Sequence, residues 1–135
     1  MRRTALDPVD LGRLLPNVML VEVGDGGIES MRFRLAGAEI EGRYNRSLKG
    51  LSVVETFALK PRAATANQWV ETLADRRPKY RLGPLQFADG QRFHHERLLL
   101  PLTETSRVSH ILGGIFFALP DGQKPREIVS YTITE

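Results

Sequence analysis

Cysteine is absent from this chain of 135 residues. Its absence excludes disulfides, thiolate metal sites and chromophores attached through a thioether or thioester bond. Long hydrophobic runs are absent as well. The first ten residues, MRRTALDPVD, hold no apolar stretch like that of a signal peptide, and no segment is long enough for a membrane span. We therefore expect a cytoplasmic protein without a membrane partner.

An excess of charge of one sign is also missing. The chain carries 19 lysines and arginines against 16 aspartates and glutamates, a formal net charge of +3. The basic residues are scattered along the sequence, whereas a nucleic-acid interface concentrates them on one face or in a known motif. We expect no nucleic-acid partner. The length itself fits one domain with an ordinary hydrophobic core.

The hydrophobic pattern predicts an α+β protein with a particular order of elements. A short helix begins at Asp7-Pro8, and a hairpin follows, with its turn at the glycine-rich segment 24–27. A helical middle region comes next, and three strands end the domain. The predicted strands are 18–23, 31–37, 79–87, 92–102 and 108–119, and the predicted helices are 38–44 and 61–77. The domain is expected over residues 1–120, and residues 121–135 form a tail that is a candidate edge strand or partner-docking segment.

Six short motifs follow one another along the chain: Leu6–Leu11, Leu14–Asn17, Phe33–Gly37, Leu48–Gly50, Glu96–Leu102 and His110–Gly113. In this order and at this spacing they resemble one PAS-like family of uncharacterised bacterial sensory domains that is common in alphaproteobacteria. The likeness covers roughly residues 3–119.

The resemblance implies a five-stranded antiparallel sheet with helices packed on one face. It also implies a stand-alone sensory or regulatory module that binds a small molecule, forms a homodimer, or docks on an unidentified signalling protein. PAS pockets lie in the core between helices and sheet. The residues expected to line such a pocket are Phe33, Leu35, Ile40, Tyr44, Phe57, Trp69, Leu73, His110 and Leu112.

Several of these residues also have a simpler interpretation. Trp69 on its helix is more typical of core packing than of a ligand cavity. Arg34 is a possible polar anchor for a carboxylate or phosphate, but its alternation with Phe33 favours a position on the solvent face. We favour the simpler interpretation for both residues.

The histidines do not predict a metal site or a cofactor. His94, His95, Glu96 and His110 are the only cluster with ligand chemistry, and their spacing along the predicted strands is incomplete. We expect no metal and no cofactor, with neither haem nor flavin favoured, and a colourless purified protein.

Two alternatives stay open. A small cone-shaped α+β enzyme or binding protein of the ketosteroid-isomerase type has a similar length, but it needs a buried acid, and the aspartates here fall at caps and turns. The sequence shows no catalytic constellation, and we expect no enzyme. A dimerisation module with a filled core is the other alternative.

Overall fold

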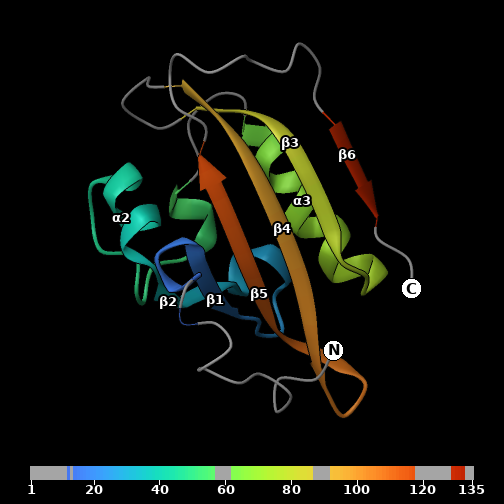
Figure 1. Cartoon of the computed structure of the whole chain (residues 1–135). Helices are drawn as coiled ribbons and strands as arrows, with labels where there is room; N and C mark the ends of the chain where they lie inside the picture. The colour runs from blue at the N-terminus through green and yellow to red at the C-terminus, as the bar shows by residue number, and fades with distance from the viewer. Residues whose placement is uncertain (1–11, 13, 57–61, 87–91, 118–128, 133–135) are drawn as a thin grey trace.

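A computed structural model describes residue 12 and residues 14–56, 62–86, 92–117 and 129–132. Its centre is one antiparallel sheet with the strand order β2-β1-β5-β4-β3-β6 (Figure 1). The strands are β1 Val18–Glu22, β2 Arg32–Ala36, β3 Lys79–Gln86, β4 Arg92–Glu104, β5 Arg107–Phe117 and β6 Val129–Thr132. The helices are α2 Ala38–Tyr44 and α3 Arg62–Asp75, and short 3₁₀ helices cover η2 Leu15–Asn17, η3 Gly27–Ser30 and η4 Val53–Thr56.

The helical segments between β2 and β3 cover one face of the sheet, which we call the helix-side face; the opposite face is the outer face. Figure 1 shows α3 behind β3 and β4, with α2 to one side near β1 and β2. The predicted α+β class and the five-stranded sheet with helices on one face are confirmed, and β6 pairs with the edge strand β3. The short helix expected from Asp7 lies mostly outside the described residues, of which Leu15–Asn17 form η2.

Two glycines allow segments to approach one another closely. A Cβ on Gly37 would lie 2.0 Å from the Leu15 carbonyl oxygen, so only glycine lets η2 pass the start of α2. A Cβ on Gly113 would lie 2.4 Å from Met19 Cε, and the glycine therefore leaves the space that the Met19 side chain occupies. Gly113 lies in β5, which is a central strand of the sheet, as its apolar sequence predicts. Its helix-side face is buried, but its outer face is only partly covered, since Leu112 is buried there and Phe116 is exposed.

The interior on the helix-side face has two chemically different halves. Beneath β1, β2 and β5 it is apolar, with Met19, Phe33 and Ile111 among its buried side chains. Beneath β3 and β4 it is largely polar and cationic. The outer face carries a separate apolar cluster around Val18, Leu102 and Leu112. Among the described residues, no helix is long and apolar enough to cross a membrane.

Candidate functional site

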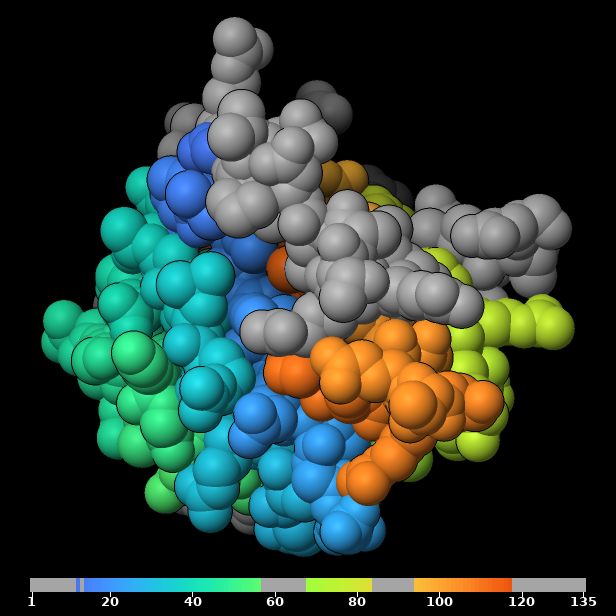
Figure 2. Space-filling model, turned by 90° about the horizontal axis from the view of Figure 1, so that it is seen from below, coloured from blue at the N-terminus to red at the C-terminus, as the bar shows by residue number. Residues whose placement is uncertain are grey.

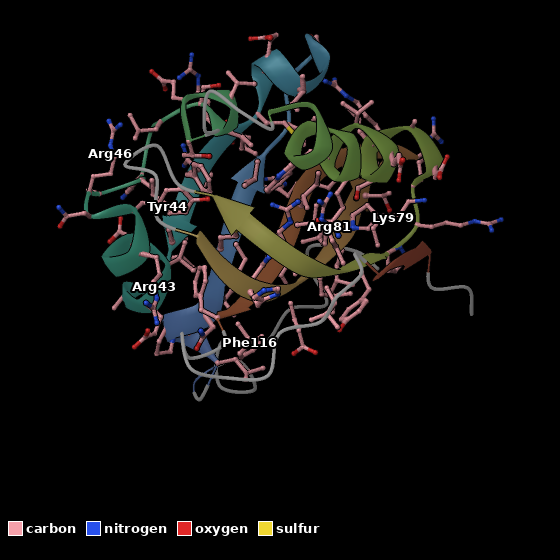
Figure 3. All side chains as sticks on the ribbon, turned by 90° about the horizontal axis from the view of Figure 1, so that it is seen from above. Arg43, Tyr44, Arg46, Lys79, Arg81 and Phe116 are labelled. Atoms are coloured by element: carbon pink, nitrogen blue, oxygen red, sulfur yellow. The ribbon has the colours of Figure 1, made fainter. Side chains whose placement is uncertain are left out.

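The polar half of the interior is built by β3, β4 and α3. Lys79 and Arg81 of β3 are 4% and 8% exposed, and His95 and Arg97 of β4 are 1% and 2% exposed. Strand pairing places Arg81 opposite Arg97, and Gly83 opposite His95. Because alternate residues of a strand share one face, His95 and Arg97 lie on the same side as Leu99 of the helix-side core. Figure 3 shows Lys79 and Arg81 between α3 and β3.

Helix α3 contributes polar groups to the same region. Gln68 is 2% exposed, and its side-chain amide forms a two-way contact with Arg97. Arg97 Nε donates to Gln68 Oε1, and Gln68 Nε2 donates to the Arg97 carbonyl oxygen at 3.2 Å. Thr72 is fully buried one turn later and donates to the Gln68 carbonyl oxygen at 2.7 Å. The two Gln68–Arg97 bonds join α3 to β4, while the Thr72 bond lies within α3.

Arg97 is the central cation of this region. Its guanidinium carbon lies 5.8 Å from the centroid of the Trp69 ring, within the range of a cation–π contact. Burial lowers the pKa of Arg97 to about 10; the nearby Tyr44 acts in the opposite direction, and Arg81 adds to the lowering. The guanidinium is therefore still charged at neutral pH. Burial raises the pKa of Tyr44, which keeps its phenol protonated.

His95 lies beside Arg97 and is neutral. Its Nδ1 is 2.7 Å from the Gly83 carbonyl oxygen. Burial lowers the pKa of His95 to about 3, and the positive charges of Arg97 and Arg81 contribute, while the bond to Gly83 opposes the shift. Its other ring nitrogen, Nε2, is buried and has no hydrogen-bond partner among the described residues.

Acidic residues of α3 border the region. Lys79 Nζ donates to Asp75 Oδ2 at 2.5 Å, and Asp75 is half exposed. Burial lowers the pKa of Arg81, and the negative charge of Glu71 opposes that shift. The positive charge of this half of the interior is thus partly balanced at the rim of α3.

The residues that the sequence predicted for a pocket lie on two different faces of the sheet. Phe33, Ile40 and Trp69 are buried in the helix-side core, and Tyr44 and Leu73 pack against it. Phe57 lies outside the described residues. Of this set, Trp69 touches the polar half directly through Arg97, and Tyr44 is coupled to the same guanidinium.

Three predicted pocket residues, Leu35, His110 and Leu112, lie on the outer face, away from the helix-side core. A β-bulge in the β1–β2 pairing leaves Arg34 without a partner, since Leu20 pairs with Leu35 and the next residue, Val21, pairs with Phe33. The extra residue turns Leu35 to the outer face, where it is 45% exposed. Leu112 belongs to the outer cluster. His110, two residues before Leu112 on β5, pairs across the sheet with Glu22 and Leu102.

Arg34 and Glu96 also lie outside the polar interior. The Arg34 side chain is 60% exposed, and its Nε lies 4.0 Å from Glu22 Oε2. Glu96, on the opposite face from His95, accepts a hydrogen bond from the Tyr80 hydroxyl at 2.8 Å. In the part of the chain that the structure describes, no three histidine or acidic side chains are grouped as metal ligands.

The sequence interpretation missed the residues that define the polar interior, namely Gln68, Arg81, His95 and Arg97. The one sequence pattern that could have indicated these buried residues is the alternation along β4. His95, Arg97 and Leu99 share one face, while Leu98, Leu100 and Leu102 share the other. Because the second set is uniformly apolar, the pattern alone favours placing the histidine and arginine on the solvent side. The structure buries His95, Arg97 and Leu99 and leaves Leu98 and Leu100 partly exposed.

A surface hollow of about 420 Å³ lies at the end of the sheet where the β1–β2 loop approaches the β4–β5 turn. The loop between β1 and β2 and the turn between β4 and β5 form its walls, and Arg76 at the end of α3 borders it. Figure 2 shows the orange β4–β5 turn beside the blue β1–β2 segment at this end. An ion pair between Arg107 and Asp25 joins the loop to the turn. None of the residues that define the polar interior lines this hollow.

Comparison with known proteins identifies the class. Residues 1–116 match a family model described as a PAS domain, and the chain belongs to this family. It is a PAS-type sensory domain, and the ketosteroid-isomerase alternative is not supported. No curated protein matches the sequence closely enough to serve as a relative.

Solved structures with the same fold include light-oxygen-voltage (LOV) domains. One, studied with a flavin analogue, has a TM-score of 0.66 at 11% identity, with 84% of each chain covered. A LOV protein of Rhodobacter sphaeroides has a TM-score of 0.63 at 13% identity, covering 87% of this chain and 71% of the other. An RNA-binding LOV receptor has a TM-score of 0.61 at 20% identity, covering 87% of this chain and 34% of the other.

These structures correct the expectation that the chain carries no cofactor. The solved domains that share this fold are LOV domains, which bind flavin, so the fold gives no ground for expecting that a cofactor is absent. The expectation depended on the missing cysteine and on the absence of a visible cofactor motif. A missing cysteine excludes a cysteinyl adduct, but it does not bear on noncovalent binding of a planar ring. The expectation of a colourless protein fails with the argument that produced it.

Proposed function

We propose that this domain senses a small molecule held in the polar half of its interior, between α3 and strands β3 and β4. The observation that carries the proposal is the burial of Gln68, His95 and Arg97 together, each at most 2% exposed, beside the Trp69 ring. Burying a charge or a polar group costs free energy unless partners replace water. A module whose core served packing alone would be more stable with apolar residues there.

A flavin is the first ligand to test, because the fold is of a flavin-binding kind. The residues present fit its chemistry. Trp69 offers an aromatic ring and Arg97 a positive charge beside it. His95 Nε2, which has no partner among the described residues, offers an acceptor for the polar edge of a heteroaromatic ring. A flavin bound here would supply absorption of visible light. Because the chain has no cysteine, it would be held without a cysteinyl bond.

The experiment is native mass spectrometry of freshly purified protein, together with its visible absorption spectrum. We expect a noncovalent adduct in the wild-type protein, or saturable binding of added riboflavin. Arg97→Met keeps the apolar stem but removes the charged donors, and we expect it to weaken binding about 10-fold or more. Arg34→Met is the matched control, since Arg34 is exposed and lies on the bulge. Equal binding by the two variants, or no ligand in any of them, would refute the proposed site.

We further propose that the signal leaves the domain by protein contact, through a homodimer that uses the outer face. Leu35 and Phe116 are exposed apolar residues of that face, at 45% and 42%; Figure 3 shows Phe116 on the side away from α3. Light scattering over a concentration series tests this. We expect a dimer in the wild-type protein and a monomer in Phe116→Glu, and a monomeric wild-type protein would contradict it.

We propose no catalytic activity for the domain. Ser109 Oγ lies 2.9 Å from His110 Nδ1, and Glu22 Oε2 lies 4.0 Å from His110 Nε2. These groups resemble a nucleophile, a base and an orienting acid in kind only. Neither Ser109 nor His110 lines the 420 Å³ hollow, and a nucleophile needs a site for the reacting group. Hydrolysis of an activated ester that disappears in Ser109→Ala would overturn this statement.

A further inference from the structure

The unpartnered nitrogen of His95 constrains what the interior site binds. A backbone carbonyl can only accept a hydrogen bond, so the 2.7 Å contact with Gly83 requires the proton to lie on Nδ1. His95 is neutral because its pKa is lowered to about 3. In a neutral imidazole with its proton on Nδ1, the other nitrogen carries a lone pair. Nε2 is therefore an acceptor, and it is buried without a donor among the described residues.

The surrounding charges narrow the kind of donor that can approach this acceptor. Arg97 lies two residues along β4 on the same face, and Arg81 lies on the neighbouring strand opposite Arg97. A cationic donor such as an ammonium group would meet two buried positive charges, and the repulsion disfavours it. The donor must belong to a neutral or anionic molecule. The same arginines favour ligand atoms that accept hydrogen bonds next to that donor.

We infer that His95 is the specificity-determining residue of the interior site, and that its Nε2 accepts a hydrogen bond from an N–H group of a neutral or anionic heteroaromatic ligand in which carbonyl groups adjoin that N–H. This inference rests on the proposed function, because it concerns the same site. It goes further by naming the feature that the ligand must have. An imide or lactam edge has it, and a ring whose corresponding nitrogen is methylated does not.

The test compares riboflavin with riboflavin methylated at the imide nitrogen, N3. We expect the wild-type protein to bind riboflavin about 10-fold more tightly or better, since methylation leaves a buried acceptor unpaired. His95→Phe keeps a flat ring but lacks the acceptor, and we expect it to bind the two compounds equally. Discrimination that persists in His95→Phe would overturn the inference, as would equal binding of both compounds by the wild-type protein, the result expected if water satisfied Nε2.

A second measurement uses the unaltered protein and does not depend on the variant's folding. The ¹⁵N resonance of His95 Nε2 reports its protonation and its hydrogen bonding. We expect it to move upfield when riboflavin binds, and to move much less with the methylated compound. Binding of riboflavin that shifts Arg97 but leaves Nε2 unchanged would refute the role of His95 and leave the proposed site standing. Absence of binding by any compound would refute both.

Discussion

Acidification is expected to destabilise this domain through a single buried histidine. The folded pKa of His95 is about 3, against an ordinary value of 6.5, with burial as the largest cause and the charges of Arg97 and Arg81 next. The unfolded chain therefore takes up a proton at this residue below about pH 6.5, whereas the folded chain does not. The contribution of neutral His95 to the free energy of unfolding is therefore complete above pH 6.5, and it is lost progressively as the pH falls toward 3.

The magnitude follows from these two pKa values. Between pH 7 and pH 5, preferential protonation of the unfolded state lowers the free energy of unfolding by about 2 kcal/mol. The full loss, reached near pH 3, is about 5 kcal/mol on the same basis. That is a large part of the 5–15 kcal/mol that is typical of a domain of this size.

Urea unfolding at pH 7 and pH 5 measures this effect in wild-type protein and in His95→Phe. The variant loses the bond to Gly83, which lowers its stability at both pH values. It also removes the titrating group, so its own change between the two pH values should be about 2 kcal/mol smaller than that of the wild-type protein. An equal response in His95→Phe and wild-type protein would refute the account of this histidine.

Three further stability predictions follow from packing, each measured by denaturant unfolding. Trp69→Ala should cost about 3–5 kcal/mol, because it removes a large buried side chain; a cost below about 1 kcal/mol would contradict the buried position. Gly37→Ala should cost about 3 kcal/mol or more, since its Cβ would meet the Leu15 carbonyl oxygen. Its control, Gly42→Ala, has open space and should stabilise α2 by about 0.5–1 kcal/mol. Gly113→Ala should cost about 1–3 kcal/mol, because the flexible Met19 side chain can partly yield.

Much of the fold could be predicted from local patterns in the sequence. Helix α2 occupies Ala38–Tyr44 as expected, because Gly37 and Asn45 mark its ends and Asn45 adopts the left-handed conformation with φ 57°. The glycine-rich turn placed the β1–β2 hairpin, and the apolar sequence of β5 placed it at the centre of the sheet. These features depend on residues that are close together in the chain.

The candidate site could not be predicted in the same way, because it depends on how distant segments meet. The bulge at Arg34 reverses the side of Leu35, and a strictly alternating pattern cannot reveal an extra residue. Arg97 and His95 are polar residues on a strand, and their burial depends on the position of α3, some 29 residues earlier in the chain at Gln68. In the composition, Arg97 is only one of many basic residues scattered along the chain. The likeness to LOV domains emerged from comparison of structures at 11–20% identity, where sequence patterns are too weak to show it.

The central claim is that a small molecule binds between α3 and strands β3 and β4. Trp69 is the only tryptophan in the chain, and its ring lies against Arg97 in this region. The NMR resonance of its indole N–H is therefore a single, assigned reporter of the site. We predict that riboflavin shifts this resonance saturably, and that Arg97→Met weakens the titration while Arg34→Met does not. Riboflavin binding that leaves the Trp69 resonance unchanged, or no binding at all, would contradict the account.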